Sequence, residues 1–317
     1  FIQLNYNYEI YISFMKRKNI TIGSRGSKLA LIYANKVKDK ISEIFSSTIE
    51  IKIIKTSGDE NQIDRLSEIG GKGLFSKKIE MELLNKSIDL AVHALKDMPS
   101  VETDGLITSC FLKRNFPNDV LISKNNLTLD KLKPSSIVGT SSYRREYQLM
   151  HKRGDLIYKL IRGNVDTRIK KLNEGLYDSI ILSKAGIDSL NLNKLITQEF
   201  SVEEIIPSVG QGTIAIQCRN DDKEMIELLK KINHEETKIC VTAERKVLKI
   251  LEGDCDTAIG AFAFMEKKKI RLIAELYSVD GKKRYFFEST NDFQLAKELG
   301  EIVGNFLKKK SEGNYKR

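Results

Sequence analysis

The chain has 317 residues, 41% of them hydrophobic and 30% charged, so it is long enough for two or three domains with cores of their own. No uninterrupted apolar run reaches the ~20 residues needed to cross a bilayer. The net charge of +10 favours an anionic partner but does not by itself indicate nucleic acid. The four cysteines and three histidines lack the spacing of a disulfide framework or a metal site, which favours a reducing compartment and no metal cofactor.

The first half of the chain alternates strand and helix patterns after an N-terminal extension, residues 1–18, that is predicted to be flexible. Strands are expected at 20–23, 49–53 and 88–92, and a helix begins near Ser27 with apolar residues on one side. The polar, glycine-bearing stretch 56–73 predicts a long loop of the kind that often closes over a site as a lid.

The middle of the chain repeats this design. Strands are expected at 137–139, 157–161 and 179–182, and helices at 143–151 and from 165 to 172. The echo of Ile22–Arg25 in Val138–Ser141 predicts two similar α/β lobes with mainly parallel sheets and antiparallel strands at the edges. Ligands of such sheets bind at the carboxyl ends of the strands.

The pattern changes beyond about residue 235. A helix is expected at 236–251, strands at 258–264 and 270–277, a hairpin turn at Asp280–Gly281 leading into a strand at 284–288, and a final helix around 293–306. This part is predicted to be a small α+β domain with an antiparallel sheet.

Two arginine-rich segments, Gly139–Arg145 and Leu160–Arg168, each follow a short apolar run and open a helical pattern. Guanidinium groups, hydroxyls and backbone N–H groups at such a turn suit carboxylates or phosphates. Arg25 opens the first helix, where a cation is unfavourable unless an anion joins it. The alternative for Arg168, which lies later in its helix, is an exposed ion pair on the helix surface.

Asp97 follows a predicted strand beside Lys96 and is a candidate for stabilising a cation or exchanging a proton. Its alternative is a surface ion pair of little energetic value. Cys255 lies in a Gly-Asp loop where a thiol can be exposed and nucleophilic, whereas the other three cysteines lie in apolar sequence and are predicted to be inert core thiols.

Taken together, these segments resemble the porphobilinogen deaminase family. The matching stretches occur in family order from about residue 20 to 310: Ile22–Ser27, Gly70–Phe75, Val92–Pro99, Gly139–Arg145, Leu160–Arg168, Val209–Gly212 and Leu251–Cys255. The resemblance implies an α/β fold with two lobes like those of type II periplasmic binding proteins, plus a small α+β C-terminal domain. The implied domains are 19–113 with 209–232, then 114–208, then 233–317.

The resemblance also implies a hydroxymethylbilane synthase, a transferase that condenses four porphobilinogen molecules head to tail with loss of ammonia. The chain grows on a dipyrromethane primer held by a thioether, and hydrolysis releases hydroxymethylbilane. The catalytic carboxylate maps onto Asp97 and the attachment cysteine onto Cys255. Asp97 is also implied to bind the cofactor. The remaining implied positions are cofactor-binding Lys96, Ser142, Arg144, Arg145 and Arg162, substrate-binding Arg25, Ser27, Arg162 and Arg168, and the lid residue Lys72.

The sequence departs from the family pattern at Ser189, where an arginine is usual, and at Asp254, which replaces a glycine before the cysteine.

Two other functions would each explain part of the sequence. A two-lobed binding protein for a small anionic solute explains the lobes and the arginines but neither Cys255 nor the third domain. A nucleic-acid-binding protein would explain the basic charge, but no recognition motif supports it. We expect a monomer without nucleic-acid or membrane partners, in the cytoplasm or in a plastid (apicoplast-type) stroma, and not secreted.

Overall fold

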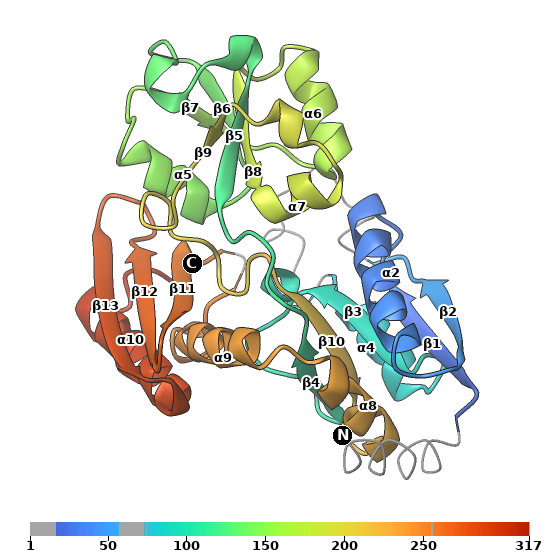
Figure 1. The fold of residues 1–317 in the computed structure, drawn as a ribbon. Coiled ribbons are helices and arrows are strands. Elements are labelled where there is room, and N and C mark those ends of the chain that lie inside the picture. The colour runs from blue at the N-terminus through green and yellow to red at the C-terminus, as the bar shows by residue number, and fades with distance from the viewer. Residues whose placement is uncertain (1–16, 57–72, 74, 255, 317) are drawn as a thin grey trace.

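The computed structural model describes residues 17–56, 73, 75–254 and 256–316. Two five-stranded sheets form the centres of two α/β lobes, and a separate three-stranded antiparallel sheet forms a C-terminal domain (Figure 1). This confirms the predicted fold class. Lys72, most of the predicted lid and Cys255 lie outside the described residues.

The first lobe contains a sheet with the strand order β2-β1-β3-β10-β4. Its elements are β1 (Asn19–Ser24), α2 (Lys28–Ser42), β2 (Thr48–Ile53), α4 (Lys77–Leu84), β3 (Leu90–Ala94), β4 (Leu106–Phe111), β10 (Ile214–Arg219) and α8 (Lys223–Ile232). Helix α2 begins where the Ser27 hydroxyl accepts a hydrogen bond from the Ala30 N–H. It buries Tyr33, Val37 and Ile41, which recur every four residues and therefore share one helix face against the sheet.

The second lobe has the corresponding strand order, β7-β6-β8-β5-β9. Its elements are β5 (Asp119–Ser123), β6 (Ile137–Gly139), α5 (Tyr143–Met150), β7 (Ile157–Lys159), α6 (Val165–Asn173), β8 (Ser179–Ser183), α7 (Lys184–Ser189) and β9 (Gln198–Glu199). In both lobes three parallel strands are followed by one antiparallel strand and a final strand. The predicted similarity of the lobes is confirmed.

The sequence led us to expect antiparallel strands at the edges of the sheets, but in the structure they lie inside the sheets. Strand β10 lies between β3 and β4, and β5 lies between β8 and β9. Both strands enter their lobe from the other one, β5 after β4 and β10 after β9, so they run against the strands joined by helical crossovers. An interior position surrounds each with hydrogen-bonded neighbours, which suits their fully buried residues such as Val120 and Ile216.

The C-terminal domain packs two helices on the sheet β11-β12-β13. Its elements are α9 (Glu235–Ile250), β11 (Ile259–Glu266), β12 (Lys269–Tyr277), β13 (Arg284–Asp292) and α10 (Ala296–Ser311). Short 3₁₀ turns occur at Leu95–Asp97, Lys124–Asn126, Leu129–Lys131, Asn193–Leu195 and Phe293–Leu295. No helix within the described residues is long and apolar enough to span a membrane.

A buried carboxylate joins the C-terminal domain to both segments that connect the lobes. Glu244 on α9 is fully buried and binds Arg114, in the first connecting segment, through two N–O contacts of 2.7 Å. It also accepts hydrogen bonds from the backbone N–H groups of Gly210, in the second connecting segment, and Ala263 on β11. Removing one partner of such a pair leaves an uncompensated buried charge, so the contact holds the three units together.

Candidate active site

A cleft of ≈ 920 Å³ is lined by residues from both lobes and from the C-terminal domain. Among the described residues, eight basic side chains line it: Arg25, Lys28, Lys55, Lys96, Arg144, Arg145, Arg162 and Arg168. Three acidic side chains do so: Asp97, Asp166 and Asp254. Ser27 and Ser142 line it as well, so every described residue that the sequence nominated for the site lies at one cleft.

The first lobe contributes a carboxylate and an arginine at neighbouring strand ends. Asp97 ends the 3₁₀ turn that follows β3, and Arg25 follows β1, which pairs with β3. Arg25 Nη1 lies 3.9 Å from Asp97 Oδ2, and the guanidinium lies 4.0 Å from the centroid of the Phe75 ring. The Asp97 side chain is 35% exposed. It is therefore open to a ligand while a cation and an aromatic face fix its surroundings.

Lys96 lies beside Asp97 in a more enclosed position. Its Nζ is 3.5 Å from Gln211 Oε1. Burial lowers the pKa of Lys96 to about 8, and the nearby charge of Arg145 adds to this effect, while Asp97 and Asp119 oppose it. A bound anion would restore the ordinary preference of this amine for its charged form, so Lys96 favours an anionic ligand.

The second lobe holds its first two arginines with one buried carboxylate. Ser142 caps α5 by accepting a hydrogen bond from the Arg145 N–H. Arg144 Nη1 lies 2.8 Å from Asp119 Oδ2, and Arg145 Nη2 lies 2.7 Å from Asp119 Oδ1. Burial alone would raise the pKa of Asp119, but the two arginines lower it well below its usual value. Asp119 thus fixes the direction of both guanidinium groups.

Gln211 extends this cluster to the segment that returns to the first lobe. Its Nε2 donates to Asp119 Oδ1 at 2.9 Å and to the carbonyl of Pro117 at 2.6 Å. Its Oε1 faces Arg145 and Lys96. The neighbouring glycines have φ angles of +71° at Gly210 and +81° at Gly212, a backbone form that other residues adopt only with strain. The turn therefore presents Gln211 to both lobes at once.

The second arginine segment places Arg162 and Arg168 on the cleft as well. Arg162 is buried, and Arg168 Nε donates to the carbonyl of Gly163 at 2.8 Å. Burial lowers the pKa of Arg168 to about 10, with Arg145 and Arg162 contributing in the same direction. Such crowding of cations is costly without an anion, which favours a bound anion over a solvated surface pair for Arg168.

Two residues of this site were not found by the sequence reasoning, Asp119 and Gln211. Asp119 immediately precedes the apolar run Val120–Ile122, and an acidic residue at the start of a buried strand is a signal that it has a charged partner. Gln211 lies between two glycines, which we read only as a crossover. Cys110, Cys218 and Cys240 are buried, as predicted for core thiols, and burial raises the pKa of each to about 12.

The cleft fits a flexible oligomer that carries many carboxylates, as a dipyrromethane cofactor with added pyrroles does. The donor set is arginine-rich, which suits bidentate carboxylate binding, and the volume exceeds that of a single small acid. Within the described residues, no group of three or more His, Cys, Asp or Glu side chains is arranged to hold a metal ion.

Comparison with known proteins agrees with this chemistry. The profile described as "Porphobilinogen deaminase, dipyromethane cofactor binding domain" matches residues 20–227, and the profile of the porphobilinogen deaminase C-terminal domain matches residues 238–309. Porphobilinogen deaminase of Staphylococcus epidermidis is 43% identical over 291 residues, covering 90% of this chain and 94% of that protein. The enzyme of Bacillus pumilus is 46% identical over 267 residues, covering 83% of this chain and 86% of that protein.

Among solved structures, the periplasmic VFT2 domain of Bordetella pertussis BvgS is similar, with a TM-score of 0.44 and 12% identity over 72% of this chain and 91% of that one. The matches to the sequence profiles and to the bacterial enzymes cover most of the chain at high identity. The chain therefore belongs to the porphobilinogen deaminase family, the transferases of tetrapyrrole synthesis that use a dipyrromethane cofactor.

Proposed function

We propose that Asp97 is the catalytic carboxylate of a hydroxymethylbilane synthase and that the cations around it bind the carboxylates of the pyrrole chain. The observation that carries this proposal is the convergence of Asp97 with eight basic side chains on one cleft, counted among the residues that the structure describes. The family reaction joins four porphobilinogens head to tail, with loss of ammonia from each, and ends in hydrolysis to hydroxymethylbilane. Every ring bears an acetate and a propionate, so each added ring brings two negative charges.

The roles of the residues follow from charge. Asp97, 35% exposed, is placed to bind pyrrole N–H groups and to stabilise the cation left on a substrate methylene when its ammonia departs. Arg25 and Ser27 stand beside it for the substrate, together with Arg162 and Arg168. A pyrrole α-proton is lost in each condensation, and a carboxylate at this position suits its removal.

We assign six side chains to binding of the cofactor: Lys96, Asp97, Ser142, Arg144, Arg145 and Arg162. A dipyrromethane bound through Cys255 supplies the primer to which new rings are joined. The tether makes each condensation intramolecular in effect. We assign Lys72 to a lid over the cleft and propose the domain boundaries given above, with residues 1–18 as an extension.

We propose further that the enzyme is a monomer that acts in the cytoplasm, without nucleic-acid or membrane partners. The two relatives described above are bacterial enzymes, and this gives no support to a localisation in a plastid. Size-exclusion chromatography with light scattering measures the oligomeric state, and a dimer at micromolar concentration would contradict the monomer.

Intact-mass spectrometry of freshly purified protein tests the cofactor and the function together. The expected mass is that of the chain plus two pyrrole units, and bilane formation from porphobilinogen accompanies it. Cys255→Ala is expected to lose both the added mass and the turnover. The matched control, Cys240→Ala at a buried thiol, is expected to keep both. An unmodified wild-type chain without turnover would overturn the proposal.

A further inference from the structure

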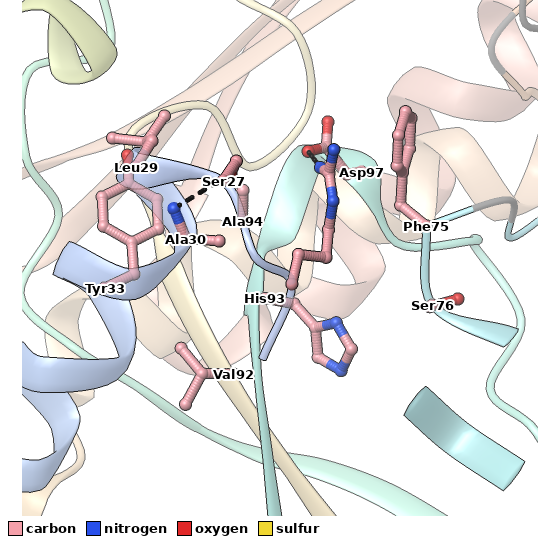
Figure 2. A pocket seen from close by; sticks show the side chains of 11 residues that line it. Ser27, Leu29, Ala30, Tyr33, Phe75, Ser76, Val92, His93, Ala94 and Asp97 are labelled. Carbon is pink, nitrogen blue, oxygen red and sulfur yellow. Dashed lines mark hydrogen bonds and ion pairs between the residues drawn. The ribbon is translucent and has the colours of Figure 1, made fainter. Parts of the chain in front are cut away.

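A small side cavity of ≈ 50 Å³ opens beside the catalytic carboxylate. It shares Arg25, Phe75 and Asp97 with the main cleft, and His93 also lines it (Figure 2). A water-sized molecule needs ~10–15 Å³ of such space, so the cavity admits molecules of that size but not a pyrrole ring. Its position next to Asp97 places it where a small leaving group would separate from the substrate.

Two buried side chains, Glu80 and Gln217, determine which nitrogen of His93 carries the proton. The Glu80 carboxylate accepts hydrogen bonds from Thr103 Oγ1 at 2.9 Å and from Gln217 Nε2 at 3.2 Å. Because a carboxylate accepts and the amide NH₂ donates, the Gln217 oxygen must face the other way. That oxygen lies 3.2 Å from His93 Nε2, which must therefore carry the proton.

The remaining ring nitrogen, Nδ1, is consequently a hydrogen-bond acceptor. No described residue hydrogen-bonds it, while His93 is among the residues that line the cavity. Burial lowers the pKa of His93 to about 4, the Gln217 contact opposes this, and the charge of Arg25 adds to it. The ring is therefore neutral at neutral pH, and it adds no positive charge to a place where a cation develops on the substrate.

We propose that this cavity is the subsite for the leaving amino group, with His93 Nδ1 accepting a hydrogen bond from ammonia as it departs; the proposal rests on the family reaction. Ammonia has three N–H groups and one lone pair. The cavity offers two acceptors, Nδ1 and the Asp97 carboxylate, and one cationic donor, Arg25. In the step, the methylene carbon–nitrogen bond of the substrate ammonium breaks and its electron pair leaves with nitrogen.

This step is balanced without proton transfer to His93. Neutral ammonia forms with its three hydrogens, and the positive charge moves from nitrogen to the pyrrole methylene, beside Asp97. His93 stays neutral throughout and orients the amino group away from the face that the next ring attacks. The Glu80–Gln217 pair then acts as a positioning unit, because it fixes which lone pair His93 presents.

The first test measures return of isotopically labelled ammonium into unreacted porphobilinogen during turnover by the holoenzyme, divided by bilane formed in the same reaction. We expect the ratio for His93→Gln to fall about tenfold, the effect of losing one hydrogen bond to the leaving group. His93→Asn, whose amide oxygen replaces Nδ1, is expected to recover most of it. Since both quantities are measured in one sample, a loss of active enzyme lowers both equally and does not change their ratio.

A ratio that is the same in wild type and both variants, including zero in all three, would overturn the subsite. Failure of the family function itself is distinct, since wild-type holoenzyme would then form no bilane. Nitrogen NMR of wild-type holoenzyme with labelled histidine provides a second test that needs no variant. Ammonium chloride, but not potassium chloride at equal ionic strength, is expected to shift Nδ1 of His93, and a proton found on Nδ1 or no shift would contradict the proposal.

Discussion

In the first lobe the cleft carboxylate, Asp97, is 35% exposed and stands 3.9 Å from a single arginine nitrogen. In the second lobe another carboxylate, Asp119, is fully buried between Arg144 and Arg145 at 2.8 and 2.7 Å. The strand orders of the two lobes are alike, but the two carboxylates lie on different strands, since Asp97 follows β3 and Asp119 begins β5. An exposed carboxylate is available to a reacting group, whereas the charge of a buried carboxylate is neutralised by the arginines that it holds in place.

The comparison shows that two similar α/β lobes can contribute different kinds of side chain to one cleft. The first lobe supplies a loosely paired acid and a lysine whose pKa is lowered to about 8. The second supplies cations whose direction is set by Asp119. Loss of an acidic group should therefore affect turnover in one lobe and stability in the other.

Asp97→Asn is expected to have the largest effect on turnover, a loss on the order of 10³-fold or more, because a neutral amide cannot stabilise the substrate cation. The unfolding midpoint in urea should change little, since the native ion pair is long and partly exposed. The measurements are steady-state bilane formation and urea unfolding. Asp104→Asn, at an exposed site in the same lobe, is the control. Normal turnover by the Asp97 variant would remove this residue from the mechanism.

Asp119→Asn is expected to reverse this pattern, with a loss of ~3–5 kcal/mol in the free energy of unfolding because two buried arginines lose their counter-charge. Chemical denaturation of the cofactor-loaded protein measures it. The control is Asp155→Asn, which breaks an exposed ion pair with Arg153 in the same lobe and should have a small effect. Equal effects of the two substitutions would show that burial does not distinguish these carboxylates.

The buried imidazole of the first lobe predicts a pH dependence. Because the folded pKa of His93 is lowered to about 4 from 6.5, the unfolded chain binds a proton more readily between these values. This contribution to stability is present above pH 6.5 and lost as the pH falls toward 4, by about 3 kcal/mol in total.

His93→Gln should remove that part of the slope when unfolding is measured in urea from pH 4 to 7. His151→Gln, at an exposed histidine of the second lobe, should leave it in place. A wild-type slope that matches that of the His93 variant would contradict the prediction.

The smallest expected effect concerns Lys96. At pH 8 about half of its amine should be uncharged, so it should react severalfold faster with an acylating reagent than its partial burial suggests. Peptide mass spectrometry of cofactor-free Cys255→Ala protein, compared across pH 7 to 10, measures this rate against that of the exposed Lys28. A rate for Lys96 that stays below that of Lys28 at every pH would show that the cleft does not lower the pKa of Lys96.

Local sequence patterns were sufficient for the lobes and for the residues at strand ends. Arg25 and Asp97 were found because each lies within three residues of the end of a strand, and parallel strands bring such ends together. The arginine segments were found because turn, hydroxyl and guanidinium are neighbours in the chain. These features depend on contacts of short range.

The remainder depends on segments that meet only in three dimensions. Gln211 and Asp119 are 92 positions apart, and Gln217 and Glu80 are 137 apart. Neither pair has a periodicity or spacing that marks it. The interior antiparallel strands were missed for the same reason, because β10 finds its place between β3 and β4 only after the chain has built the second lobe.

The contacts of Glu244 have a consequence for the thermal unfolding of the enzyme. Its carboxylate holds Arg114 and Gly210, on the two connecting segments, and Ala263 on β11. No part can come away without breaking the contacts that secure the others. We therefore expect the molecule to melt as a single cooperative unit, so that the C-terminal domain is not shed first, and a scanning calorimeter should record one endotherm.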